Sequence, residues 1–155
     1  DGHPEVSSFP SIYLSEYFHP STWQHFISTG WEEVINQFIK TYRVLFDASA
    51  ADPVPSNSQT KIEYVGVKEG MTTVGEKRDE TLFVNEQIFR KELQNLICQY
   101  KTLDIGRFFL LAHAAFEKTL HNHNSKKLIF YHIHNPSPQV EINFISSLPW
   151  DNAIF

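Results

Sequence analysis

The segment from Leu128 to Pro136, which reads LIFYHIHNP, constrains the fold of this chain more than any other. It is an apolar run that ends in two histidines one residue apart and then meets a proline. Such a run is typical of a strand, and side chains alternate between the two faces of a strand, so His132 and His134 are expected to point the same way. Two neutral imidazoles that converge at a strand end can hold a divalent metal ion. The sequence therefore predicts a strand here, with a candidate metal site at its end.

Length and charge exclude several classes of protein. The chain has 155 residues, 41% of them apolar, which is enough for one sizeable core. Its net charge is −5 and its basic residues are scattered, so we expect no nucleic-acid partner. No run is long enough to span a bilayer, and no signal peptide is visible, so we expect no membrane association. With a single cysteine the pattern favours the cytoplasm, while a fragment of a longer protein or a secreted effector stays open.

The chain divides into an N-terminal arm and one domain. Residues 1–20 carry prolines and aromatic side chains but few charges, which predicts an irregular arm that packs against the body. Residues 21–155 are expected to form a single α/β domain. Ser21 or Thr22 can cap a short first helix, and apolar residues then recur at helical spacing from Trp31 through Phe46.

Two more helices are expected in the second half of the chain. The segment Glu86 to Tyr100 has apolar residues on one face and is predicted to be a helix. Cys98 lies on this helix and is expected to be buried in the protein core. Asp104 is suited to cap the next helix, Ile105 to Leu120, which is apolar on most sides and so should be largely buried. His113 lies in this helix and is favoured as a hydrogen-bonded core residue.

Four segments have the composition of strands, with β-branched and aromatic residues between turn signals. They are Lys61 to Val67, Thr81 to Asn85, Leu128 to His134 and Val140 to Ile145. The last two would form a hairpin around 135–139. Together with the helices, this order predicts an α/β (α+β) fold, a single mixed sheet with flanking helices.

A metal-dependent hydrolase needs an open coordination position and a nearby carboxylate base. His132 and His134 offer two ligands for this purpose. Glu63 is a candidate base, because an acidic residue inside an apolar strand is costly to bury without a partner, although a solvent-facing position is equally open. The third ligand is open among four residues: Asp104, His113, Glu141 and Asp151.

The order of these residues resembles the JAMM or MPN+ zinc metalloproteases. That family has a glutamate on an early strand, a long helix, a strand that ends in His-x-His, and then a serine and an aspartate. The matching positions here are Glu63 with Gly66 in EYVG, His132 and His134 in HIHNP, Ser146 or Ser147, and Asp151.

The resemblance implies a cytidine-deaminase-like fold and a zinc-dependent peptidase. It implies that His132, His134 and Asp151 hold zinc and that Glu63 activates water. Ser147 would then steady the developing oxyanion at a peptide or isopeptide carbonyl of a protein or ubiquitin-like substrate.

A second function class is also open. The acidic balance and the aromatic side chains between Phe9 and Trp31 fit a non-catalytic module, either inhibitory or protein-binding, that meets a protein partner through this region.

Overall fold

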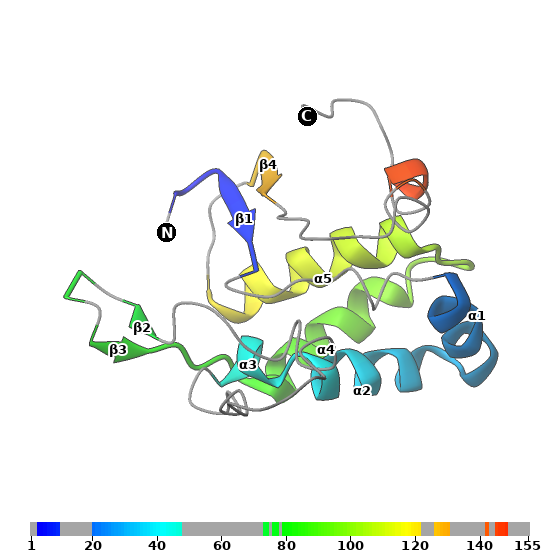
Figure 1. Ribbon diagram of the computed structural model, residues 1–155, viewed down its shortest axis with the longest axis horizontal. Helices are drawn as coiled ribbons and strands as arrows, with labels where there is room; N and C mark the ends of the chain where they lie inside the picture. Colours follow the sequence, from blue (N-terminus) through cyan, green and yellow to red (C-terminus); the bar gives the residue numbers. More distant parts are fainter. Residues whose placement is uncertain are drawn as a thin grey trace, which may run out of the picture.

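A computed structural model of the chain describes residues 3–9, 20–47, 73–74, 76–77, 79–121, 126–130, 142 and 145–148. This part of the chain is a mixed, mostly helical α/β structure (Figure 1). Its elements are β1 (Val6–Ser8), α1 (Pro20–Thr29), α2 (Trp31–Thr41), α3 (Arg43–Phe46), β2 (Thr73–Val74), β3 (Glu80–Thr81), α4 (Glu86–Ile97), α5 (Ile105–Thr119) and β4 (Leu128–Phe130).

The first helical region is interrupted twice. The pattern through Phe46 is helical as predicted, but α1 ends before Gly30 and α2 ends before Tyr42. Gly30 has a φ of 93°, a backbone conformation that residues with a side chain rarely adopt, and it lets the chain change direction between α1 and α2. The expected short first helix is therefore α1, and the pattern expected from Trp31 through Phe46 is divided into α2 and α3.

Side-chain caps fix the starts of α4 and α5. The Asn85 side chain accepts a hydrogen bond from the backbone N–H of Ile88, and the Asp104 side chain accepts one from Arg107 N at 2.7 Å. The predicted cap at Asp104 is thus confirmed, and α5 is largely buried as expected. The prediction that Cys98 lies in the core is wrong. Cys98 follows the last turn of α4 and is exposed, because the buried face of α4 ends at Ile97.

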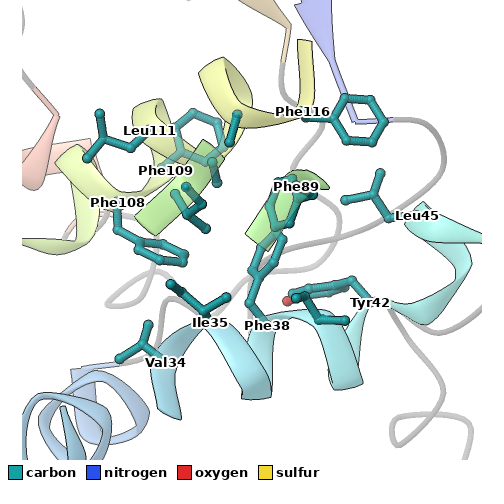
Figure 2. Packing of buried hydrophobic residues seen from close by; sticks show 14 of the residues in the cluster. Val34, Ile35, Phe38, Tyr42, Leu45, Phe89, Phe108, Phe109, Leu111 and Phe116 are labelled. Carbon is teal, nitrogen blue, oxygen red and sulfur yellow. The ribbon is translucent and has the colours of Figure 1, made fainter. Parts of the chain in front are cut away.

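The core lies where α2, α4 and α5 meet, and Figure 2 shows its aromatic centre. Phe38 on α2 is fully buried, with its ring centroid 5.9 Å from that of Phe89 on α4 and 5.7 Å from that of Phe108 on α5. Tyr42 closes the cluster at 5.1 Å from Phe38. Three helices thus share one set of rings, which ties them into one hydrophobic core.

The strands form two small sheets within the described residues. β1 and β4 pair in parallel, with Val6 opposite Leu128 and Ser8 opposite Phe130 (Figure 1). β2 and β3 form a short antiparallel pair. The residues of β1 were expected to be irregular, but they adopt a strand because β4 supplies the hydrogen-bonding partner.

Other strand predictions have mixed outcomes. The strand expected at Thr81 to Asn85 is shorter: β3 stops at Thr81, and a single bridge joins Phe83 to Asp47. Of the strand expected over 140–145, the described positions Ile142 and Ile145 are helical, since 145–147 form a helical turn on α5. The strand expected at Lys61 to Val67 lies outside the described residues. The division into arm and domain stays a prediction.

Candidate functional site

The strand that leads to the two histidines is β4, and its side chains alternate as predicted. Leu128 and Phe130 are 56% and 65% exposed, whereas Ile129 between them is half-buried against the core. One face of β4 therefore meets solvent and the other meets the protein. The exposed face is the even-numbered one.

The amino end of β4 is anchored by polar contacts with the segment before β1. The carbonyl oxygen of Glu5 accepts hydrogen bonds from Lys127 N at 2.8 Å and Leu128 N at 3.1 Å. The Lys127 ammonium also forms an ion pair with the Glu5 carboxylate. Lys126 pairs with Glu117 of α5 at 3.4 Å, and both of these side chains are mostly shielded from solvent. The start of β4 is therefore fixed on two sides.

Most of the predicted site residues lie in parts of the chain that the structure does not describe. Glu63, His132, His134 and Asp151 lie outside the described residues, and so does Glu141. Their roles stay predictions. Within the part of the chain that the structure describes, no three histidine, cysteine, aspartate or glutamate side chains are grouped as metal ligands.

Of the residues Glu63, His132, His134, Ser147 and Asp151, Ser147 is the one that lies within the described part of the chain. It is half-buried in the helical turn at 145–147, where Leu148 N donates to Ile145 O at 3.2 Å. Its backbone carbonyl packs against the first turn of α5: a Cβ added to Gly106 would lie only 2.1 Å from Ser147 O. The absence of a side chain at Gly106 thus allows the turn that carries Ser147 to sit directly on α5.

Two of the alternative third ligands have other partners. Asp104 is exposed and uses a carboxylate oxygen to cap α5. His113 is 2% exposed, and its Nδ1 lies 2.9 Å from Ser7 Oγ, so its assignment as a hydrogen-bonded core residue is confirmed.

The surroundings of His113 are almost wholly aromatic. The Phe9 ring stacks on the imidazole with centroids 3.8 Å apart, and the Phe109 ring meets it edge-on at 4.6 Å. His113 Nε2 is buried and has no hydrogen-bond partner within the described residues. Burial lowers the pKa of His113 from 6.5 to about 3, because water no longer solvates the charged form.

Sequence reasoning missed the Ser7–His113 pair. The apolar surroundings of His113 in the sequence indicated burial, but no local pattern could point to a partner 106 positions away. That partner is supplied by the parallel pairing of β1 with β4, which is a tertiary contact.

The aromatic residues proposed as a docking region pack mainly within the protein. Trp23 is 4% exposed and Phe26 is 8% exposed, while Phe9 and Trp31 are partly buried against the core. The described part of this region therefore contributes to stability through burial.

Comparisons with known proteins assign no family: no family model matches the chain, and neither a curated protein nor a solved structure matches it. In the described residues, no helix has both the length and the apolar character needed to cross a membrane.

Proposed function

We propose that the chain is a zinc-dependent hydrolase of peptide or isopeptide bonds, with zinc held by His132, His134 and Asp151. The observation that carries the proposal is the alternation along β4, where Leu128 and Phe130 face solvent. Continued with a period of two, this alternation predicts that both histidines lie on the solvent-facing side. A catalytic metal needs that access.

The donor set suits zinc. Two imidazole nitrogens and one carboxylate are typical of catalytic zinc sites, which keep a fourth position for water or substrate. When bound, zinc would polarise the scissile carbonyl and favour deprotonation of water. Glu63 would accept the proton from the attacking water, and the Ser147 hydroxyl would donate a hydrogen bond to the developing oxyanion.

The order of elements also supports the proposal. The long buried helix α5 comes directly before β4, as the resemblance to JAMM peptidases expects, and the turn that carries Ser147 lies against the first turn of α5. A cytidine-deaminase-like arrangement is part of the same proposal, with an extended protein or ubiquitin-like tail as substrate. A reducing compartment such as the cytoplasm suits the exposed free thiol of Cys98.

The proposal is tested by pairing metal binding with cleavage of an isopeptide-linked substrate. Glu63→Gln should keep zinc and lose cleavage by at least about 100-fold, because general acid–base groups contribute about that much or more. His132→Ala should lose both zinc and cleavage. His25→Ala, which alters an exposed histidine on α1, is the matched control and should keep both. Cleavage that persists in Glu63→Gln would refute the assigned mechanism.

A second candidate function is a protein-binding module, and the exposure of Leu128 and Phe130 on one face of β4 favours it. In this second proposal the partner contacts β4, and not the N-terminal aromatic residues. A chain that binds no zinc, but loses capture of a purified protein partner in Phe130→Ser and keeps it in Phe83→Ser, would support this function. Phe83 is the matched control because it is also an exposed phenylalanine, at 70%, and it lies far from β4 in the sequence.

A further inference from the structure

The N-terminal strand β1 is held in place by one buried polar contact and one aromatic stack. Ser7 is 2% exposed, and its hydroxyl hydrogen-bonds to His113 on α5. Phe9, directly after β1, stacks on the same imidazole and meets Phe116 edge-on at 5.4 Å. The imidazole is therefore the common contact for Ser7 of β1 and for Phe9, which follows it.

Protonation would change this contact in a definite way. A charged imidazole carries a hydrogen on both nitrogens, and the N–H at Nε2 would be buried with no acceptor within the described residues. It would also bring a positive charge among the rings of Phe9 and Phe109 without a paired carboxylate. The imidazole can be protonated readily only if β1 and Phe9 move away and admit water.

The charged groups around the imidazole do not offset that cost. In the segment just before β1, Glu5 is already paired with Lys127. The ring of His3 is exposed and accepts a hydrogen bond from Glu5 N. On α5, Glu117 is paired with Lys126. On α2, the apolar ring of Phe38 faces this stack, with its centroid 6.1 Å from that of Phe9.

We infer that His113 is an acid-sensitive latch whose protonation releases strand β1 from α5 and β4 while the helical core stays folded. The release is local because the attachments of β1 are few. It pairs with one three-residue strand, whereas α2, α4 and α5 share the aromatic cluster around Phe38. The inference is independent of the proposed zinc site, since it uses only described residues.

The size of the effect follows from linkage. Opening returns the imidazole to water, where its pKa is about 6.5, from a folded value of about 3. Between pH 7.5 and pH 5.0 the equilibrium constant for opening should therefore rise about 30-fold. The released form is therefore about 30-fold more favoured under mildly acidic conditions than under neutral ones.

Amide hydrogen exchange by NMR on the full chain tests the inference. The amides of Lys127 and Leu128, which both donate to Glu5 O, report on the β1–β4 contact. After correction for the intrinsic effect of pH, their protection should fall about 30-fold at pH 5.0, and at both pH values it should be lower than that of Leu93 in α4, whose exchange requires the helical core to unfold. Unchanged protection at Lys127 and Leu128, or protection equal to that of Leu93, would overturn the inference.

Variants separate His113 from other titrating groups. His113→Gln keeps a polar side chain for Ser7 but cannot titrate near pH 6, so the 30-fold change should disappear. Ser7→Ala keeps the imidazole, and it should open more at both pH values with the same 30-fold ratio, which preserves the test if the glutamine variant does not fold. His3→Gln should behave as the wild type. Loss of the pH effect in His3→Gln, or its persistence in His113→Gln, would overturn the inference.

Discussion

Ser7 and His113 are 106 positions apart in the chain, yet a hydrogen bond of 2.9 Å joins them in the interior. This contact ties the first strand to α5, which at 15 residues is the longest helix described. It explains how a short N-terminal strand is retained, because an unpaired buried serine or histidine would cost free energy.

The stability of the fold should depend on pH through His113. Its pKa is lowered on folding, so the folded state favours the neutral form, whereas the unfolded chain takes up a proton below about pH 6.5. The stabilisation is therefore complete above pH 6.5 and is lost as the pH falls toward 3. Between pH 7.5 and 5.0 the free energy of unfolding should fall by about 2 kcal/mol from this residue.

Urea unfolding at the two pH values measures this change. pH 5.0 is suitable because it lies above the ordinary pKa values of aspartate and glutamate side chains, about 3.9 and about 4.3. His113→Gln should lose the 2 kcal/mol decrease. An equal decrease in that variant would mean that other groups carry the pH dependence.

Gly106→Ala should destabilise the protein although alanine is the better helix former. Alanine in place of glycine gains about 1 kcal/mol in a helix, but its Cβ would lie 2.1 Å from Ser147 O. The backbone must shift, and overpacking of this kind costs about 1–3 kcal/mol, so we expect a net loss of stability by urea unfolding. Ala114→Gly, at an exposed position of α5, gives the ordinary cost of glycine in this helix. A stabilised Gly106→Ala would show that the turn at 145–147 is not seated on α5.

Removal of an aromatic ring should lower the stability of the protein strongly at Phe38 in the core and only weakly at Phe83 on the surface. Phe38 of α2 is completely buried against rings from α4 and α5, so Phe38→Ala should cost about 3–5 kcal/mol, a large share of the stability of a domain this size. Phe83→Ala removes the same ring at a 70% exposed position and should change stability by less than about 0.5 kcal/mol. Thermal unfolding followed by circular dichroism compares the two, and similar losses in both would contradict this account of the core.

Local signals in the sequence account for much of the helical structure. Asp104 and the apolar pattern after it predict α5 nearly to its end, and the pattern from Trp31 predicts α2. The break at Tyr42, between α2 and α3, was missed because Tyr42 continues the apolar pattern from Trp31 through Phe46. These features depend on neighbours within a few residues.

Tertiary contacts are what the local pattern could not supply. The β1–β4 pair joins residues about 120 positions apart. β4 lies within a predicted strand, but the three residues of β1 are too few to be recognised as a strand from the sequence alone. At 140–145 the alternation of apolar residues favoured a strand, but the described positions are helical, because the following turn packs its backbone onto Gly106. For the candidate site, the alternation along β4 was predictable, whereas the four main site residues stay predictions from sequence.

The central claim, a zinc site formed by His132 and His134, is tested most directly by metal analysis. Purified untagged protein, incubated with zinc and dialysed, should contain about one zinc per chain by inductively coupled plasma mass spectrometry. The double variant His132→Ala/His134→Ala should contain none while it keeps the helical circular dichroism of the wild type, and His25→Ala should keep its zinc. A wild-type chain without zinc, or a double variant that retains it, would contradict the claim.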